Sequence, residues 1–230
     1  MGAPALGGAV IEPAGGSAAL GIFGGTFDPI HVAHLAVAEA AREALGLERI
    51  LFIPAGEPPH KPVAAVSPAH HRLAMVEAAI ADNPAFATSR IELDREGPSY
   101  TVDTLAALHA GLGAPDGQDP DGPAELVLIL SAEAFLELPG WHDPAGVLAL
   151  ATLAVAPRDG YPDAEAAFLE RHFPGTAGRA VFLDGPRLRL SASEVRARAR
   201  AGRSLRYLVP DAVAAYIGDH DLYHDTRRID

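Results

Sequence analysis

The 230-residue sequence contains no cysteine, which excludes a disulfide framework, a thiolate metal site and a cysteine nucleophile. Of its 18 basic residues only Lys61 is a lysine, so this position is more informative than any single arginine. No apolar run approaches the roughly 18 residues that a membrane span requires. The first residues lack the basic start and the unbroken apolar stretch of a secretory signal. We therefore expect a cytoplasmic protein with no membrane partner.

Positive charge is also scarce, because 18 basic residues face 30 acidic ones and the formal charge is −12. Proteins that bind nucleic acids non-specifically usually have the opposite balance, so no nucleic-acid partner is expected. The charge is unevenly distributed. Residues 171–206 hold nine arginines and two acidic residues, Asp184 and Glu194, which gives this stretch a net charge of +7. A local positive field of this kind favours a small polyanion as ligand.

The hydrophobic residues, 49% of the chain, suffice for the core of one domain. Residues 1–18 are rich in Gly, Ala and Pro, and we expect a disordered leader there. Residues 19–224 alternate short apolar runs with amphipathic segments, which is typical of β-α-β units. Residues 225–230 are expected to be a tail.

The expected strands lie at about 20–23, 50–55, 86–94, 125–130, 151–157 and 179–185. The expected helices lie at about 32–45, 68–82, 101–112, 163–173, 192–202 and 210–217, with a short helix directly after the fourth strand. These segments predict an α/β fold: a Rossmann-like single domain with a mostly parallel sheet of about five or six strands flanked by helices. The last helices, at about 192–217, would form a C-terminal subregion. A ligand should lie at the carboxyl ends of the strands, near a topological switch point.

The most informative stretch follows the first strand and reads Gly24-Gly25-Thr26-Phe27-Asp28-Pro29-Ile30-His31-Val32-Ala33-His34. Two glycines let the backbone turn close to a ligand, and the helix then begins with unpaired N–H groups that favour an anion. Because His31 and His34 are three residues apart, both imidazoles face the same anion from the first helical turn. On spacing alone, such a pair of histidines is more often structural, or a weak metal site, than catalytic. Neither the P-loop lysine pattern nor the dinucleotide-binding fingerprint is present.

The full string resembles the GGTFDPxHxGH signature of the bacterial nicotinate-nucleotide adenylyltransferases, a family of the HxGH nucleotidyltransferase superfamily. Ala33 stands where the family usually has glycine. The resemblance implies that His31 and His34 are catalytic. It also implies that ATP is bound by this loop, through Gly24, Gly25, Thr26, Phe27, His31 and His34.

A second motif, Pro58-Pro59-His60-Lys61, is similar to the family's Pro-Pro-His-Lys loop. This similarity implies that Lys61 assists catalysis, as a point charge on phosphate. The alternative is a proline-rich surface loop.

A third motif, at residues 97–105, is similar to the family's G-P-S-Y-T-x-D-T-L segment, whose backbone N–H groups hold the nicotinate carboxylate. The mononucleotide-binding residues implied here are Tyr100, Thr101 and Val102. Ser99 or Thr101 would otherwise serve as a plain helix cap.

A fourth motif, at residues 138–142, resembles the family's L-P-x-W segment, whose tryptophan stacks on the pyridine ring. It implies that Trp141 and His142 bind the mononucleotide, whereas the alternative for Trp141 is a packing role. Ser131 and Glu133 occupy the place of the family's G-x-D, which contacts the mononucleotide, and both differ from that pattern.

A fifth motif, at residues 190–196, is similar to the family's I-S-x-T-x-x-R and implies that Ser191, Ser193 and Arg196 bind the ATP phosphates, with Arg196 acting in catalysis. Ser191 and Glu194 also have the spacing of a capping box. The ending at residues 206–223 fits the family's R-Y-L-x-P…Y-I…L-Y, so the matches run from about residue 20 to residue 223.

The resemblance implies transfer of AMP from ATP to nicotinate mononucleotide in NAD biosynthesis, with release of pyrophosphate. Mg²⁺ is the implied cofactor, bound with ATP and without dedicated protein ligands. The alternatives are nicotinamide mononucleotide or phosphopantetheine as acceptor, a non-catalytic nucleotide-binding regulator, and a metal-dependent hydrolase that uses His31 and His34. The sequence leaves the oligomeric state open, and a homo-oligomer is compatible with it.

Overall fold

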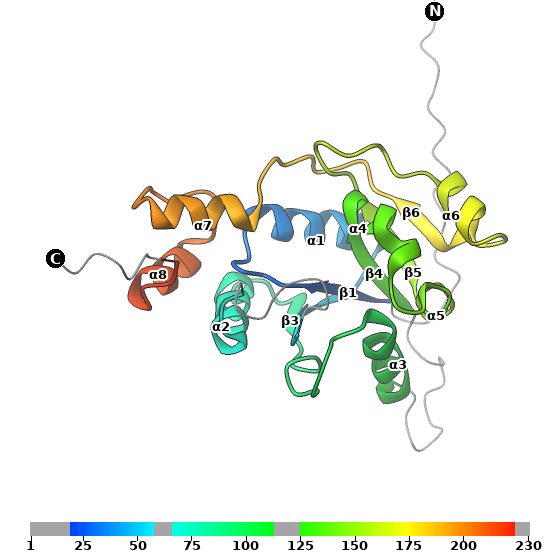
Figure 1. The fold of residues 1–230 in the computed structure, drawn as a ribbon, viewed down its shortest axis with the longest axis horizontal. Helices are drawn as coiled ribbons and strands as arrows, with labels where there is room; N and C mark the ends of the chain where they lie inside the picture. Colours follow the sequence, from blue (N-terminus) through cyan, green and yellow to red (C-terminus); the bar gives the residue numbers. More distant parts are fainter. Residues whose placement is uncertain (1–18, 58–65, 113–124, 224–230) are drawn as a thin grey trace, which may run out of the picture.

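A parallel six-stranded sheet forms the centre of the molecule (Figure 1). The computed structural model describes residues 19–57, 66–112 and 125–223. The strands are β1 (Leu20–Gly25), β2 (Arg49–Pro54), β3 (Phe86–Thr88), β4 (Leu126–Ser131), β5 (Thr152–Ala156) and β6 (Ala180–Phe182). Their order across the sheet is β3-β2-β1-β4-β5-β6, and every neighbouring pair is parallel. This is the Rossmann strand order, and its switch point lies between β1 and β4.

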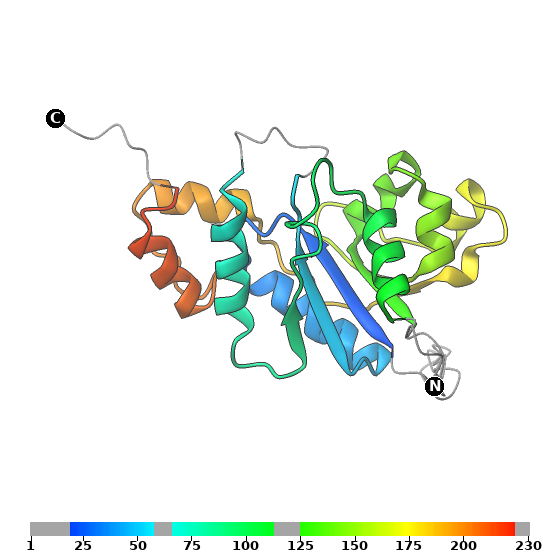
Figure 2. The ribbon, with the colours of Figure 1, turned by 90° about the horizontal axis from the view of Figure 1, so that it is seen from below.

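Helices cover both faces of the sheet. They are α1 (Val32–Leu45), α2 (Ala69–Ile80), α3 (Thr101–Leu112), α4 (Ala132–Glu137), α5 (Pro144–Leu150), α6 (Ala166–His172), α7 (Ala192–Arg200) and α8 (Asp211–Asp219). Helices α1, α2, α7 and α8 contribute to one hydrophobic cluster, and α3 to α6 contribute to the other. Figure 1 shows α1 and α3 on opposite sides of the sheet. Figure 2 shows α2, α7 and α8 gathered at one end of the molecule and α4, α5 and α6 at the other.

The central strands are buried on both faces because their apolar side chains alternate between the two clusters. In β4, Val127 and Ile129 belong to the first cluster, whereas Leu126, Leu128 and Leu130 belong to the second. All five are at most 6% exposed. Full burial of one such side chain stabilises the fold by about 1.5–3 kcal/mol. The unbroken apolar run at 126–130 is therefore a consequence of covering on both sides.

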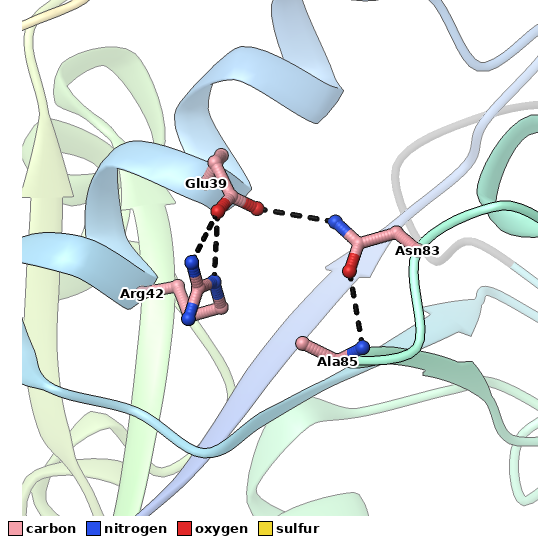
Figure 3. Close-up of polar contacts among 4 residues, drawn as sticks. All are labelled: Glu39, Arg42, Asn83 and Ala85. Carbon is pink, nitrogen blue, oxygen red and sulfur yellow. Dashed lines mark hydrogen bonds and ion pairs between the residues drawn. The ribbon is translucent and has the colours of Figure 1, made fainter.

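A polar contact at the sheet edge ties α1 to the segment that leads into β3 (Figure 3). The Glu39 carboxylate accepts hydrogen bonds from the Arg42 guanidinium and, at 3.2 Å, from the Asn83 side-chain amide. Asn83 in turn accepts a hydrogen bond from the Ala85 N–H at 3.0 Å. Glu39 and Arg42 are about one-third exposed, so solvent screens the ion pair and it contributes little to stability.

The structure confirms the predicted fold class and differs in two places. The segment expected to be extended over 86–94 is a strand only at Phe86–Thr88, where it pairs with β2, and then turns. The prediction missed α5, although Asp143 caps it and Pro144 occupies its first turn, both recognised start signals. No helix in the described ranges is long and apolar enough to cross a membrane. The expected leader at 1–18 and the tail at 225–230 lie outside the described residues.

Candidate active site

The β1–α1 loop, residues 24–31, lies at the switch point of the sheet. Gly24 and Gly25 form the carboxyl end of β1, and α1 begins seven residues later at Val32. His31 has extended backbone angles (φ −145°, ψ 169°) at the residue before the helix. The first turn of α1 contains no acidic side chain that would offset the positive end of the helix dipole, although the Val32 N–H donates a hydrogen bond to the Leu208 carbonyl at 3.0 Å. The loop therefore presents a helix N-terminus to the carboxyl edge of the sheet, as the sequence predicted.

The two predicted histidines lie face to face. Their rings are stacked with centroids 3.7 Å apart and planes inclined by 16°. The backbone N–H of His31 donates a hydrogen bond to Nδ1 of His34 at 3.2 Å. Because Nδ1 of His34 accepts this bond, the neutral ring carries its proton on Nε2. The loop thus fixes both the orientation and the tautomer of His34.

His31 is neutral at pH 7 in this arrangement. Its side chain is buried, and Nδ1 has no hydrogen-bond partner among the described residues. Burial first, and then the positive charge of Arg158, lower the pKa of His31 to about 4. A bound polyanion would oppose both effects and favour the protonated ring.

A polar cavity of about 350 Å³ joins four segments that are distant in sequence. Its lining residues are Thr26, Phe27, Asp28, His31, His34, Glu133, Arg158, Ser191, Ala192, Ser193 and Arg196. The structure therefore brings together the two histidines and the three residues predicted from the fifth motif. Gly24 and Gly25 line the two cavities beside it.

The α7 side of the polar cavity is a second helix N-terminus. The Ser191 hydroxyl caps α7 by accepting a hydrogen bond from the Glu194 N–H at 3.2 Å. Arg196 donates one hydrogen bond to the Asp28 carbonyl at 2.6 Å and another to the Ser193 hydroxyl at 3.1 Å. The guanidinium is thereby held against the β1–α1 loop. Two helix N-termini and an arginine facing one cavity form a site suited to a polyphosphate.

Arg158 is a cavity residue that the sequence analysis missed. It follows β5, the second strand beyond the switch point, and its Nε forms an ion pair with Glu133 at 3.0 Å. Glu133 also accepts a hydrogen bond from the Tyr161 hydroxyl. The sequence indicated this residue only through its position just after a strand. A charged residue that follows a buried parallel strand lies on the ligand-binding edge of the sheet. Glu133 thus lies against a cation, at a position where the family usually has a shorter acidic side chain.

An apolar cavity of about 190 Å³ lies beside the polar one and shares Phe27, His31, His34 and Arg158 with it. Ala33 and Ser131 line this apolar cavity and do not line the polar one. The methyl group of Ala33 therefore lies away from the polyphosphate-type site. Ser131 caps α4 by accepting a hydrogen bond from the Ala134 N–H at 3.3 Å.

A third cavity, of about 510 Å³, contains Trp141 in its lining and is called the Trp141 cavity below. Its lining residues are Ile22, Gly24, Gly25, Thr26, Ile53, Ala55, Glu92, Ser99, Thr101, Thr104, Leu105, Leu128, Leu130, Glu133, Ala134, Glu137 and Trp141. Thr26 and Glu133 also line the polar cavity, so the two spaces meet at the β1–α1 loop. A flat aromatic ligand in the Trp141 cavity would be adjacent to a polyphosphate in the polar cavity.

Three of the residues predicted to bind the mononucleotide line none of these cavities. Tyr100 and His142 stack on each other with ring centroids 4.3 Å apart, and Val102 packs against the second hydrophobic cluster. Thr101 and Trp141 do line the Trp141 cavity, as expected. Lys61 lies outside the described residues, and its role stays a prediction.

The floor of the Trp141 cavity contains a buried carboxyl group that the sequence analysis missed. Glu92 is 7% exposed and accepts a hydrogen bond from the Thr104 hydroxyl at 2.8 Å. Burial raises the pKa of Glu92, against the effect of that bond and of nearby Arg95. Ser99 accepts a hydrogen bond from the Gly56 N–H at 3.2 Å, so its hydroxyl joins two loops.

Comparison with known proteins agrees with this geometry. The family model described as cytidylyltransferase-like matches residues 22–198. A probable nicotinate-nucleotide adenylyltransferase of Roseiflexus sp. (strain RS-1) is 47% identical over 90% of this chain and 98% of its own length. The protein of the same description from Thermomicrobium roseum is 42% identical over 89% of this chain and 91% of its own.

Solved structures show the same fold. The nicotinic acid mononucleotide adenylyltransferase of Plasmodium falciparum complexed with NaAD has a TM-score of 0.68 at 17% identity, over 89% of this chain and 96% of that one. The complex of the same enzyme with APC has a TM-score of 0.69 at 16% identity and the same coverage. From the family match and the identity to curated relatives, the chain belongs to the cytidylyltransferase-like family and, within it, to the nicotinate-nucleotide adenylyltransferases.

Proposed function

We propose that this protein transfers AMP from ATP to nicotinate mononucleotide, releasing pyrophosphate and forming nicotinate adenine dinucleotide. The observation that carries the proposal is the junction of the polar cavity with the Trp141 cavity at the β1–α1 loop. One space suits a polyphosphate and the other suits a flat base, and their meeting point is where two phosphorylated substrates must react. The curated relatives named above support the same pair of substrates.

In this proposal the polar cavity holds the triphosphate. The N-terminus of α7 lies at this cavity, and Ser191, Ser193 and Arg196 bind the pyrophosphate that leaves. His31 and His34 lie against the phosphate that is transferred, and Arg158 adds a second guanidinium. The adenine base would occupy the adjoining apolar cavity, whose walls include Val37, Leu188 and Leu190.

The Trp141 cavity would hold the nicotinate mononucleotide. The indole of Trp141 offers a stacking surface, and Thr101 at the start of α3 places unpaired N–H groups beside the ring carboxylate. Glu133 lines both cavities and forms an ion pair with Arg158. In this proposal the Arg158 guanidinium offsets the negative charge of Glu133 next to the incoming 5′-phosphate.

The reaction requires no covalent intermediate on the protein. The 5′-phosphate of the acceptor is ionised at neutral pH and attacks the α-phosphorus directly, so a P–O bond forms as the bond to pyrophosphate breaks. Catalysis then consists of aligning two polyanions and stabilising charge on the α-phosphate and the leaving group. The Nε2–H group of His34 is the donor best placed to stabilise charge on the α-phosphate, because the His31 N–H fixes the tautomer of the ring.

Mg²⁺ fits this site as a partner of ATP. The described residues include no group of three or more histidine, aspartate or glutamate side chains arranged to hold a metal ion. The cavity carboxylates are also engaged, Glu133 by Arg158 and Asp28 by Tyr223. The ion would therefore be held through phosphate oxygens and neutralise part of their charge.

The decisive experiment incubates the protein with ATP, Mg²⁺ and one acceptor at a time: nicotinate mononucleotide, nicotinamide mononucleotide or phosphopantetheine. Mass spectrometry identifies the product, and a coupled assay measures pyrophosphate. We expect nicotinate adenine dinucleotide, formed fastest with the first acceptor. His34→Ala should abolish product, and His172→Ala, which replaces an exposed histidine on α6, should not. ATP binding with no product from any acceptor would contradict the proposal and favour a non-catalytic regulator.

A further inference from the structure

Asp28 is a buried residue in the middle of the β1–α1 loop. Its side chain is 3% exposed. One carboxylate oxygen accepts a hydrogen bond from the Tyr223 hydroxyl at 2.6 Å, and the other accepts one from the Ser67 N–H at 3.1 Å. A buried carboxylate is costly without such donors. The two bonds therefore attach the loop to the residues after α8 and to the residues before α2.

The main-chain carbonyl of Asp28 contacts a residue of the polar cavity. Its carbonyl accepts the 2.6 Å hydrogen bond from Arg196, which also bonds to Ser193. Asp28 therefore links Arg196, through its carbonyl, to Tyr223 and Ser67, through its carboxylate. A shift of this loop would move Arg196 relative to both histidines.

A second buried charged residue, Arg72, holds the β1–α1 loop and the residues before α2 together. The Arg72 guanidinium is 2% exposed and donates hydrogen bonds to three backbone carbonyls: Ser67 at 3.0 Å, Thr26 at 3.0 Å and Gly56 at 3.2 Å. Ser67 is therefore held on both sides, because its carbonyl accepts from Arg72 and its N–H donates to Asp28. Arg72 and Ser67 therefore hold Asp28 on one side. On the other side, its carboxylate accepts the hydrogen bond of the Tyr223 hydroxyl.

We propose that Asp28 is a positioning residue for adenylyl transfer, and that the Tyr223 hydroxyl, by holding its carboxylate, keeps Arg196 in register with the ATP phosphates. This inference rests on the proposed function for its ligand. Burial and the bond to Asp28 raise the pKa of Tyr223, so the hydroxyl keeps its proton and remains a donor. Tyr223 thereby helps to position the phosphate-binding residues, although it lines none of the three cavities.

The variant that tests the inference is Tyr223→Phe, which removes the donor and keeps the ring. Its matched control is Tyr216→Phe on α8, which removes a hydroxyl that contacts Nδ1 of His71 at 3.0 Å and lines none of the three cavities. We measure kcat and the KM of each substrate, and the Kd of MgATP by calorimetry. Tyr223→Phe should raise the KM and Kd for ATP about tenfold, the order expected for losing one hydrogen bond to a charged group, and change the mononucleotide KM less than about twofold. Tyr216→Phe should change neither.

Several outcomes would overturn the inference. Equal effects of the two variants, or equal increases in both KM values for Tyr223→Phe, would show that the hydroxyl contributes only to stability. A loss of kcat in proportion to the folded fraction, with both KM values unchanged, would show the same. If the wild-type protein binds MgATP but transfers AMP to no acceptor, the proposed function fails, and the two Kd values still decide the role of Tyr223.

Discussion

The rings of His31 and His34 stack 3.7 Å apart, and the backbone N–H of His31 fixes the tautomer of His34. We expect His34→Ala to lower kcat at least 100-fold, because a donor to the transferred phosphate is worth about 3 kcal/mol in the transition state. Pyrophosphate release under saturating substrates measures this. Activity within about threefold of wild type would contradict the assignment.

A second substitution at the same position separates catalysis from helix capping. In His34→Asn the amide oxygen replaces Nδ1 as acceptor for the His31 N–H, whereas nothing replaces Nε2. The free energy of unfolding of this variant should lie within about 0.5 kcal/mol of the wild-type value. Its loss of activity should equal that of the alanine variant. A variant that retained activity would show that only the cap matters.

The pKa of His31 predicts how stability depends on pH. The folded value is about 4, whereas the unfolded chain has the ordinary value of about 6.5. Between these values the unfolded state binds more protons, so the contribution of the buried neutral ring is fully present above about pH 6.5. It decreases as the pH falls toward 4, by about 3 kcal/mol in total. Urea unfolding at pH 7 and pH 4.5 should show this loss, and His31→Asn should show a smaller one. Equal losses in both proteins would exclude His31 as the cause.

Much of the fold follows from local pattern. The helix bounds at 32–45 and 101–112 match the observed ones, and the strand at 126–130 follows from an apolar run that two layers of helices must cover. Helix α5 was missed because its seven residues span less than two periods, too short for a hydrophobic period to register. The early end of β3, an edge strand that pairs with β2 alone, was not indicated by the extended pattern over 86–94.

The sequence motifs predict which residues meet in the polar cavity, but they do not predict the buried contacts that hold those residues in place. His31, His34, Ser193 and Arg196 meet in one cavity because strand ends converge at the switch point. Nothing in the sequence indicates that Tyr223 reaches Asp28, 195 residues away. Contacts of this kind depend on tertiary packing, and the pairing of Glu133 with Arg158 is another example.

A glycine substitution tests the close contact of two loops at the Trp141 cavity. A Cβ added at Gly56 would lie 2.2 Å from the backbone carbonyl oxygen of Glu92, so Gly56→Ala forces the loops apart. We expect a loss of about 2 kcal/mol or more in the free energy of unfolding. Gly111→Ala is the control, since nothing lies within 4 Å of its added Cβ and alanine favours the helix by about 1 kcal/mol. Similar unfolding free energies for the two variants would contradict the predicted clash.

Trp141 provides the test of the mononucleotide side. Its indole lines the 510 Å³ cavity and neither of the other two, so Trp141→Ala should raise the mononucleotide KM about tenfold or more and the ATP KM less than about twofold. Initial rates over a grid of both substrates separate the two effects. Tyr207→Ala is the control, because this tyrosine is 82% exposed and lines none of the three cavities. Equal rises in both KM values would show that Trp141 supports the fold of the site, and a rise in the mononucleotide value alone would assign it to stacking on the base.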